Sequence, residues 1–164
     1  MSANGPIPIT QTGSEKLKEE FKRLKTVERP QVISEIAEAR ALGDLSENAE
    51  YHAARERQAF IEGRILELED KLSRLQIIQT GKGKTDRVVF GSTVCLKDVG
   101  DESKDDEIKT YRIVGDMEAD IKNNAISLSS PMAKSLINKL VGDTVTVNLP
   151  RGEKYYEIVD IHFD

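Results

Sequence analysis

Two amphipathic helical segments separated by a turn of a few residues constrain this chain most strongly. Apolar residues of the second segment alternate spacings of four and three, the pattern of a coiled-coil seam; they are Ile61, Ile65, Leu68, Leu72 and Leu75. The turn, residues 43–48, is short enough that the two helices must run antiparallel as a hairpin. Each helix is polar outside one stripe, so pairing is what stabilises both.

The first segment extends from Ser14 to about Arg40. Pro30 lacks a backbone donor and crowds the carbonyl four residues before it, so we expect a kink or a break there. Gly43 readily adopts the left-handed conformation that ends a helix. The apolar positions expected to face the second helix are Leu17, Phe21, Leu24, Val27, Ile33, Ile36, Ala37 and Ala41.

The second half of the chain changes to a period of two, which indicates strands. Strands are expected at residues 88–96, 110–114, 126–128, 144–149 and 155–163, with an acidic hairpin loop at 100–107. Ser130 and Pro131 predict the start of a short helix, because serine caps helices and proline suits their first turn. The predicted fold class is α+β: an antiparallel helical hairpin with an acidic tip (1–80), a Gly-rich linker (81–86) and a small, strongly bent sheet with one short helix (87–164).

Composition excludes several classes of function. The net charge of −5, from 24 basic and 29 acidic residues, argues against sequence-independent duplex binding, which needs a basic face. No independent sequence-specific DNA binding is expected either. Cys95 is the only cysteine, so no disulfide framework or thiolate metal site is expected, and its apolar neighbours predict a buried thiol. His52 and His162 have no second ligand at metal spacing. No segment resembles a signal peptide or a membrane span, which predicts a cytoplasmic protein without membrane contact.

The turn contains two acids, Asp44 and Glu47, with two compatible interpretations. Their spacing matches a capping box at the start of the second helix. Two exposed carboxylates are also ligands for a hard cation such as Mg²⁺, provided that a partner supplies the remaining ligands. Arg40, Arg55 and Arg57 flank the turn and either pair with acids of the hairpin or contact a phosphate backbone.

Several motifs resemble the Gre family of bacterial transcript cleavage factors, and the resemblance covers the chain from about Pro8 to its end. The motifs are residues 36–56 around the turn, Phe60-x-Glu62-Gly63-Arg64-Ile65, Val89-Phe90-Gly91-Ser92-Thr93-Val94, Tyr111-Arg112-Ile113-Val114-Gly115 and Ile126-Ser127-x-x-Ser130-Pro131-Met132-Ala133. The resemblance implies a coiled coil joined to a domain of the FK506-binding-protein type. It also implies binding to backtracked bacterial RNA polymerase through its secondary channel, and stimulated cleavage of the nascent RNA 3′ end.

The same resemblance implies a role for six residues. Asp44 and Glu47 would act in trans in the polymerase active site, holding a Mg²⁺ shared with the polymerase and not stably bound by this chain alone. Arg55, and less directly Arg40, would face the extruded RNA. Ser130 and Pro131 would dock on the polymerase. The chain would thus be an accessory factor and not an enzyme.

Three other functions remain open at this point. The chain could occupy the polymerase channel as a regulator or inhibitor that does not stimulate cleavage. The second half could be a prolyl isomerase, for which its aromatic residues would have to line an apolar pocket. The hairpin could be a scaffold in which the acids of the turn have no chemical role.

Overall fold

The protein is described by a computed structural model covering residues 5–101, 103 and 107–164. The chain forms two compact units, one built on residues 14–75 and the other on residues 7–13 and 76–164. The first is helical and the second is a mixed sheet with one short α-helix, which confirms the α+β class. Within the described residues, no helix is both long and apolar enough to cross a membrane.

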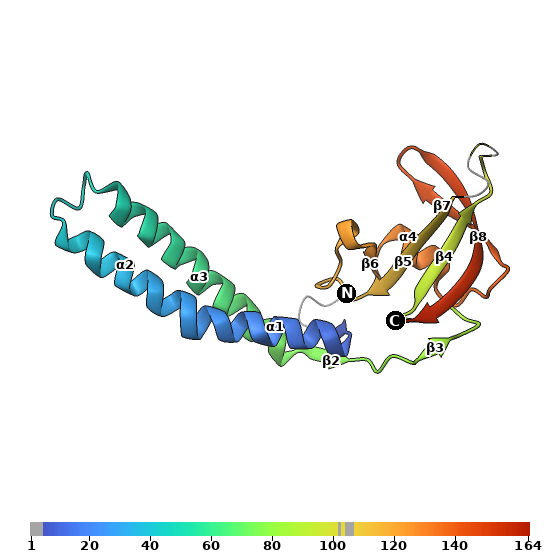
Figure 1. Ribbon diagram of the computed structural model, residues 1–164, viewed down its shortest axis with the longest axis horizontal. Helices are drawn as coiled ribbons and strands as arrows, with labels where there is room; N and C mark the ends of the chain where they lie inside the picture. Colours follow the sequence, from blue (N-terminus) through green and yellow to red (C-terminus); the bar gives the residue numbers. More distant parts are fainter. Residues whose placement is uncertain (1–4, 102, 104–106) are drawn as a thin grey trace. The chain divides into compact units, whose positions relative to one another are not determined.

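The helical unit is the predicted antiparallel hairpin. Its first arm contains α1 (Gln11–Arg23), a π-helical turn (Leu24–Glu28) and α2 (Arg29–Ala41), and its second arm is α3 (Ala49–Ser73). Figure 1 shows α2 and α3 side by side, with the loop that joins them at one end of the pair. The buried seam of α3 consists of Ala54, Ile61, Ile65 and Leu68.

A π-helical turn, and not a break, accommodates Pro30. The backbone N–H of Arg29 donates to the carbonyl of Leu24, five residues earlier, and Pro30 follows in the first turn of α2. A proline in a regular α-helix crowds the carbonyl four residues before it, and a widened turn directly upstream relieves this constraint. The first arm therefore continues to Ala41 without interruption.

The π turn shifts the buried stripe, so the apolar positions predicted after Pro30 are partly wrong. Continuing the alternation of three and four from Leu24 would place residues 31, 35 and 38 on the stripe, but the turn adds one residue. The buried residues are accordingly Val32, Ile36 and Ala39. Ile33 is 51% exposed and Val27 54%, and Ala37 and Ala41 are exposed as well.

Interhelical ion pairs that the sequence pattern did not predict join the two arms. Arg29 binds Glu62 through two contacts of 2.7 and 2.8 Å, and Arg64 binds Glu20 at 2.7 and 3.1 Å. Such two-point guanidinium–carboxylate contacts are stronger and more directional than single ones. The hydrogen bond from Arg29 holds the pKa of Glu62 below its usual value.

The second arm ends earlier than the sequence pattern predicts. Helix α3 stops at Ser73, and Leu75, expected in the coiled-coil seam, begins strand β2 (Leu75–Ile77). This strand pairs with β1 (Ile7–Ile9), and the N–H of Ile78 donates to the carbonyl of Ile9 at 2.9 Å. Backbone pairing with a segment distant in sequence therefore overrides the helical period at the end of the seam.

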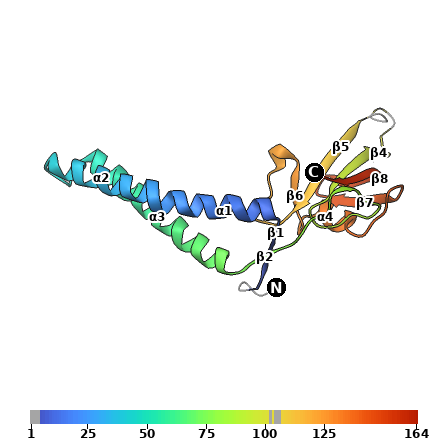
Figure 2. The same ribbon diagram turned by 60° about the horizontal axis from the view of Figure 1, so that its bottom comes forward.

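The second unit is a bent mixed sheet. Its strands are β3 (Gly83–Lys84), β4 (Thr93–Asp98), β5 (Ile108–Val114), β6 (Ala125–Ser127), β7 (Thr144–Leu149) and β8 (Gly152–Phe163). Their order is β3-β8-β4-β5-β6, and β7 also pairs with β8. Only the β5–β6 pair is parallel among these strands. Figures 1 and 2 show β8 as the long strand that β4 and β7 accompany.

One face of this sheet carries the core of the second unit. Helix α4 (Pro131–Leu136) packs its buried residues Ala133 and Leu136 against it. A 3₁₀ turn (Ile121–Asn123) precedes β6. The strands contribute Val94, Leu96, Ile113, Ile126, Val145, Val147, Tyr156, Ile158 and Ile161, and the segment before β4 contributes Val88.

Several expectations for this unit need correction. The first part of the expected strand 88–96 is a tight turn, because Gly91 adopts a positive φ of 83° and the Ser92 hydroxyl bonds Val89. Within the expected linker, Gly83–Lys84 pairs with β8. Cys95 is half-buried and not fully buried as expected. Its neighbours Val94 and Leu96 face the core, and alternation along the strand points the Cys95 side chain to the other face. In the expected acidic loop 100–107, residues 102 and 104–106 lie outside the described residues.

The segment 7–13 is held within the second unit by Glu118. The carboxylate of Glu118 accepts hydrogen bonds from the backbone N–H and the hydroxyl of Thr10, and from the N–H of Gly115 at 3.0 Å. A side chain at Gly13 would collide with Glu118, and one at Gly115 with the carbonyl of Pro8. The contact at Gly13 is with a side chain that can move, but the contact at Gly115 is with backbone, so glycine is required at position 115.

Candidate functional site

The loop that joins α2 and α3 displays both predicted acids. Residues 42–47 are all exposed, and Leu42 and Gly43 end α2 with backbone bonds to the carbonyls of Ala39 and Arg40. Gly43 has a φ of 99°, a conformation that residues with a Cβ atom rarely adopt. The backbone thus turns sharply at the end of α2. Asp44 and Glu47 follow on a short exposed loop.

Asp44 organises the loop and does not cap α3. Its Oδ1 atom accepts hydrogen bonds from the N–H of Ser46 at 3.2 Å and from its hydroxyl at 2.8 Å. The capping-box interpretation of Asp44 and Glu47 is therefore wrong. Within the described part of the chain, Asp44 Oδ2 and both oxygens of Glu47 have no hydrogen-bond or ion-pair partner. These three oxygens remain available to an external ligand.

Asn48 is the actual cap, and the sequence analysis missed it. Its Oδ1 atom accepts from the N–H of Tyr51 at 3.0 Å, and its Nδ2 atom donates to the carbonyl of Ala39 at 2.6 Å. One amide thus satisfies a free donor at the start of α3 and also bonds a carbonyl in the last turn of α2. Asparagine is among the preferred capping residues. Its position directly before the second helical segment was therefore a signal that would have identified the cap.

The three arginines near the loop have different surroundings. Arg57 pairs with Glu35 on the opposite arm at 2.9 Å, which bears out the ion-pair interpretation for this residue. Arg55 donates to Gln58 at 3.1 Å along one exposed face of α3. Arg40 lies exposed at the end of α2, and no side-chain partner is found for it among the described residues. Among the described residues, neither Arg40 nor Arg55 forms an ion pair with an acid.

A groove of about 490 Å³ lies between α2 and α3 near the loop. It is lined by Glu35, Glu38, Ala39, Leu42, Glu50, Ala53, Ala54 and Arg57.

Ser130 and Pro131 lie in the second unit, at the start of α4. The Ser130 hydroxyl accepts from the N–H of Ala133 at 3.2 Å, which confirms the predicted cap, and Pro131 is exposed in the first turn. The preceding loop is held by Asp116, which accepts from the hydroxyls of Ser127 and Ser129. These hydrogen bonds lower the pKa of Asp116. Pro131 is thus presented on a well-ordered turn.

Tyr155 and Tyr156, two of the aromatic residues considered for a prolyl isomerase site, do not converge. Tyr156 is 3% exposed within the core, whereas the adjacent Tyr155 is 41% exposed. Consecutive residues of a strand point to opposite faces, so these two rings cannot line the same pocket. The hydroxyl of Tyr155 donates to Glu153 at 2.8 Å.

Comparison with known protein families covers nearly the whole chain. Residues 7–77 match a family model described as "Transcription elongation factor, N-terminal", and residues 83–163 match "Transcription elongation factor, GreA/GreB, C-term". The chain belongs to the GreA/GreB family of transcription elongation factors. The boundary between the two matches, residues 78–82, follows β2 and precedes β3.

Individual GreA/GreB relatives agree with this assignment. "Transcription elongation factor GreA" of Xanthomonas axonopodis pv. citri is 54% identical over 95% of this chain and 97% of its own length. The protein with the same description from Maricaulis maris is 56% identical over 94% and 96%. A crystal structure of GreA factor homolog 1 from Thermus thermophilus is 30% identical and covers 96% of this chain and 99% of its own. Its TM-score of 0.42 is too low to support an argument.

Proposed function

We propose that this transcription elongation factor binds backtracked bacterial RNA polymerase through the secondary channel and stimulates the polymerase to cleave the 3′ end of the nascent RNA. As a GreA/GreB factor it is an accessory protein of RNA polymerase. The proposal rests on one observation above all: two acids stand on an exposed loop between paired helices, with three carboxylate oxygens unengaged in the described structure.

The donor set of the loop fits a magnesium ion shared with a partner. Mg²⁺ prefers carboxylate oxygens and retains several waters, so Asp44 and Glu47 are too few to bind it strongly by themselves. In the proposed complex these two carboxylates would hold the ion together with ligands of the polymerase. A divalent ion there supplies charge stabilisation for the attacking and leaving oxygens of phosphodiester hydrolysis.

The remaining residues of the tip would position these acids and the RNA. The bonds from Ser46 engage one oxygen of Asp44 and leave Oδ2 for the ion. Asn48 holds the ends of both helices together. Arg55 and Arg40 offer positive charge for the phosphates of the extruded RNA. In the second unit, Pro131 on its capped turn would contact the polymerase surface.

The test uses a stalled, backtracked polymerase complex with 3′-labelled RNA and Mg²⁺. Release of short 3′ fragments is measured with the parent protein, with Asp44→Asn and with Glu47→Gln. Glu19→Gln, which removes one negative charge from the exposed face of α1, is the matched control. We expect the two tip variants to lose at least about 10²-fold of the stimulation, comparable to removing one preorganised charge-stabilising group from an active site.

Binding of each variant to the polymerase is measured in parallel. Unchanged binding with lost cleavage supports the role of the acids in the active site. Full cleavage by both tip variants would overturn it and leave the loop a structural element. Binding without cleavage by the parent protein would instead identify a channel-binding regulator.

A further inference from the structure

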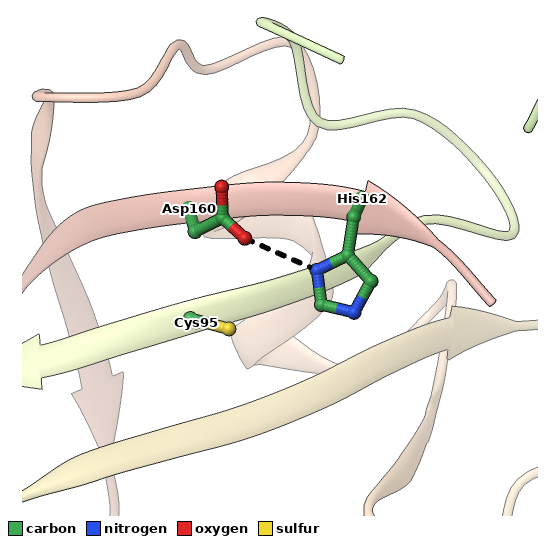
Figure 3. A group of neighbouring side chains, drawn as sticks. All are labelled: Cys95, Asp160 and His162. Atoms are coloured by element: carbon green, nitrogen blue, oxygen red, sulfur yellow. Dashed lines mark ion pairs between the residues drawn. The ribbon is translucent and has the colours of Figure 1, made fainter. Parts of the chain in front are cut away.

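Three potential metal ligands converge on the outer face of the sheet in the second unit. Cys95 lies on β4, and Asp160 and His162 lie two residues apart on β8. One ligand atom from each, a sulfur, a carboxylate oxygen and a ring nitrogen, lies within 4.8 Å of the others. Figure 3 shows the three side chains on the same side of the two strands. None of these residues has a role in the proposed cleavage function.

Strand pairing creates this cluster. Cys95 is directly opposite Asp160 in the antiparallel β4–β8 ladder, and Thr93 is opposite His162. Alternation along β8 places Asp160 and His162 on the same face, away from the buried Ile161. All three ligands are half-buried, so water can reach the site and complete a coordination shell.

The imidazole of His162 is arranged as a metal ligand. Its Nε2 atom lies 3.3 Å from Asp164 Oδ1, and Asp164 accepts a 2.9 Å hydrogen bond from Thr93. In the tautomer that carries its proton on Nε2, towards this carboxylate, the Nδ1 lone pair is free to bind a metal ion. Carboxylate–histidine pairs of this kind orient the imidazole in metal sites.

The Nδ1 atom of His162 lies directly beside a second ligand of the cluster. It is buried without a hydrogen-bond partner, and it faces Asp160 Oδ2 at 3.3 Å. With the proton on Nε2, a lone pair and a carboxylate oxygen would oppose each other across this gap. A positive ion between them removes the repulsion.

The other two ligands, Asp160 and Cys95, each contact one further polar side chain. Lys84 Nζ lies 3.3 Å from Asp160 Oδ1, the oxygen that does not face the imidazole. The Thr110 hydroxyl lies 3.7 Å from Cys95 Sγ and donates to it. Ligand atoms around a tetrahedral Zn²⁺ are separated by about 3.3–3.7 Å. Asp160 and His162 already have this spacing, and Cys95 Sγ lies within 4.8 Å of both.

We propose that Cys95, Asp160 and His162 form a binding site for a thiolate-preferring divalent metal ion, with Zn²⁺ as its natural occupant. One sulfur, one nitrogen and one oxygen ligand suit Zn²⁺ rather than Mg²⁺ or Ca²⁺, which prefer oxygen alone. Water takes the fourth position. The thiol loses its proton to solvent when the metal binds. Sequence analysis missed the site because its ligands lack any recognisable spacing and are brought together only by strand pairing.

Metal-free full-length protein is titrated with Co²⁺, which reports thiolate coordination through a near-ultraviolet charge-transfer absorption, and then with competing Zn²⁺. We expect one ion per chain and displacement of Co²⁺ by Zn²⁺. Cys95→Ser should abolish the charge-transfer band, and His162→Gln should weaken binding at least about tenfold. Asp164→Asn, which removes only the group behind the imidazole, should weaken binding about tenfold and retain the band.

Two controls separate this site from other metal binding. His52→Gln changes the other histidine of the chain, and Asp44→Asn changes the acidic loop; both should bind Co²⁺ like the parent protein. Absence of the charge-transfer band in the parent protein would overturn the proposal whatever the variants do. Equal affinities of His162→Gln and His52→Gln would overturn it as well. Circular dichroism verifies that each variant is folded.

Discussion

At the scale of single residues, Asn48, and not Asp44 or Glu47, joins the ends of α2 and α3. Asn48 Oδ1 caps α3 and Asn48 Nδ2 bonds the last turn of α2. Asp44 bonds only Ser46, two residues away. Asn48 thus caps the helix, whereas Asp44 is proposed to act in cleavage. Either residue can be replaced without removing the role of the other.

Replacing Asn48 tests this division. Asn48→Ala removes the cap and the bond to Ala39, so we expect the hairpin to lose about 1–3 kcal/mol of stability. Asn48→Asp keeps an acceptor for the cap and loses only the donor, so its loss should be about 1 kcal/mol. Urea unfolding followed by the helical circular dichroism signal measures both. If neither variant differs from the parent protein, the two hydrogen bonds do not stabilise the tip.

At the scale of elements, the π turn determines which face of α2 is buried. The extra residue before Pro30 moves the stripe from residues 31, 35 and 38 to Val32, Ile36 and Ala39. The irregular turn is tolerated for two reasons. It relieves the clash between Pro30 and the carbonyl four residues before it, and it places apolar residues against α3 in place of Gln31, Glu35 and Glu38.

Two isoleucines three residues apart provide a matched test of this register. Ile36 is 8% exposed and Ile33 51% exposed. Ile36→Ala leaves a cavity in the seam, so we expect a loss of about 2 kcal/mol or more. Ile33→Ala changes an exposed position and should alter stability by no more than about 0.5 kcal/mol. The denaturant midpoints of the two variants measure these changes in stability. Equal losses of stability would contradict the register of α2 against α3.

At the scale of the whole molecule, the proposed chemistry and the proposed docking belong to different units. Asp44 and Glu47 lie in the helical unit, and Pro131 lies in the sheet unit. Ser130 caps α4, so its replacement would disturb the helix as well as any contact. Pro131 is exposed and is the better position for testing docking.

Replacing Pro131 should separate affinity from cleavage. We expect Pro131→Ala to weaken binding to the polymerase about tenfold, equivalent to about 1.4 kcal/mol, because one contact is lost. Maximal cleavage at saturating protein should remain unchanged. Titration of the variant in the cleavage assay gives both quantities, with Thr144→Ala on an exposed position of β7 as the control. Unaltered affinity would argue against docking through this turn.

Much of the fold followed from local patterns. The antiparallel hairpin, the sheet with its short helix and the Ser130 cap were predictable, because helical and strand periods and capping preferences act over a few residues. The expected strand 88–96 was partly wrong because Gly91 and Ser92 form a turn. The loop that carries Asp44 and Glu47 was located correctly from the sequence. Asn48, the residue that caps α3, was not identified.

The sequence by itself determined the hairpin, the exposure of Asp44 and Glu47 between its helices, and the family of the chain. Only the tertiary structure decided which residues of α2 face α3, because a single added residue rotates everything beyond it. It alone brought Cys95 to Asp160 and His162, since β4 and β8 pair across a long stretch of intervening chain. Local periodicity carries no information about such pairing, because long-range contacts depend on how whole elements pack.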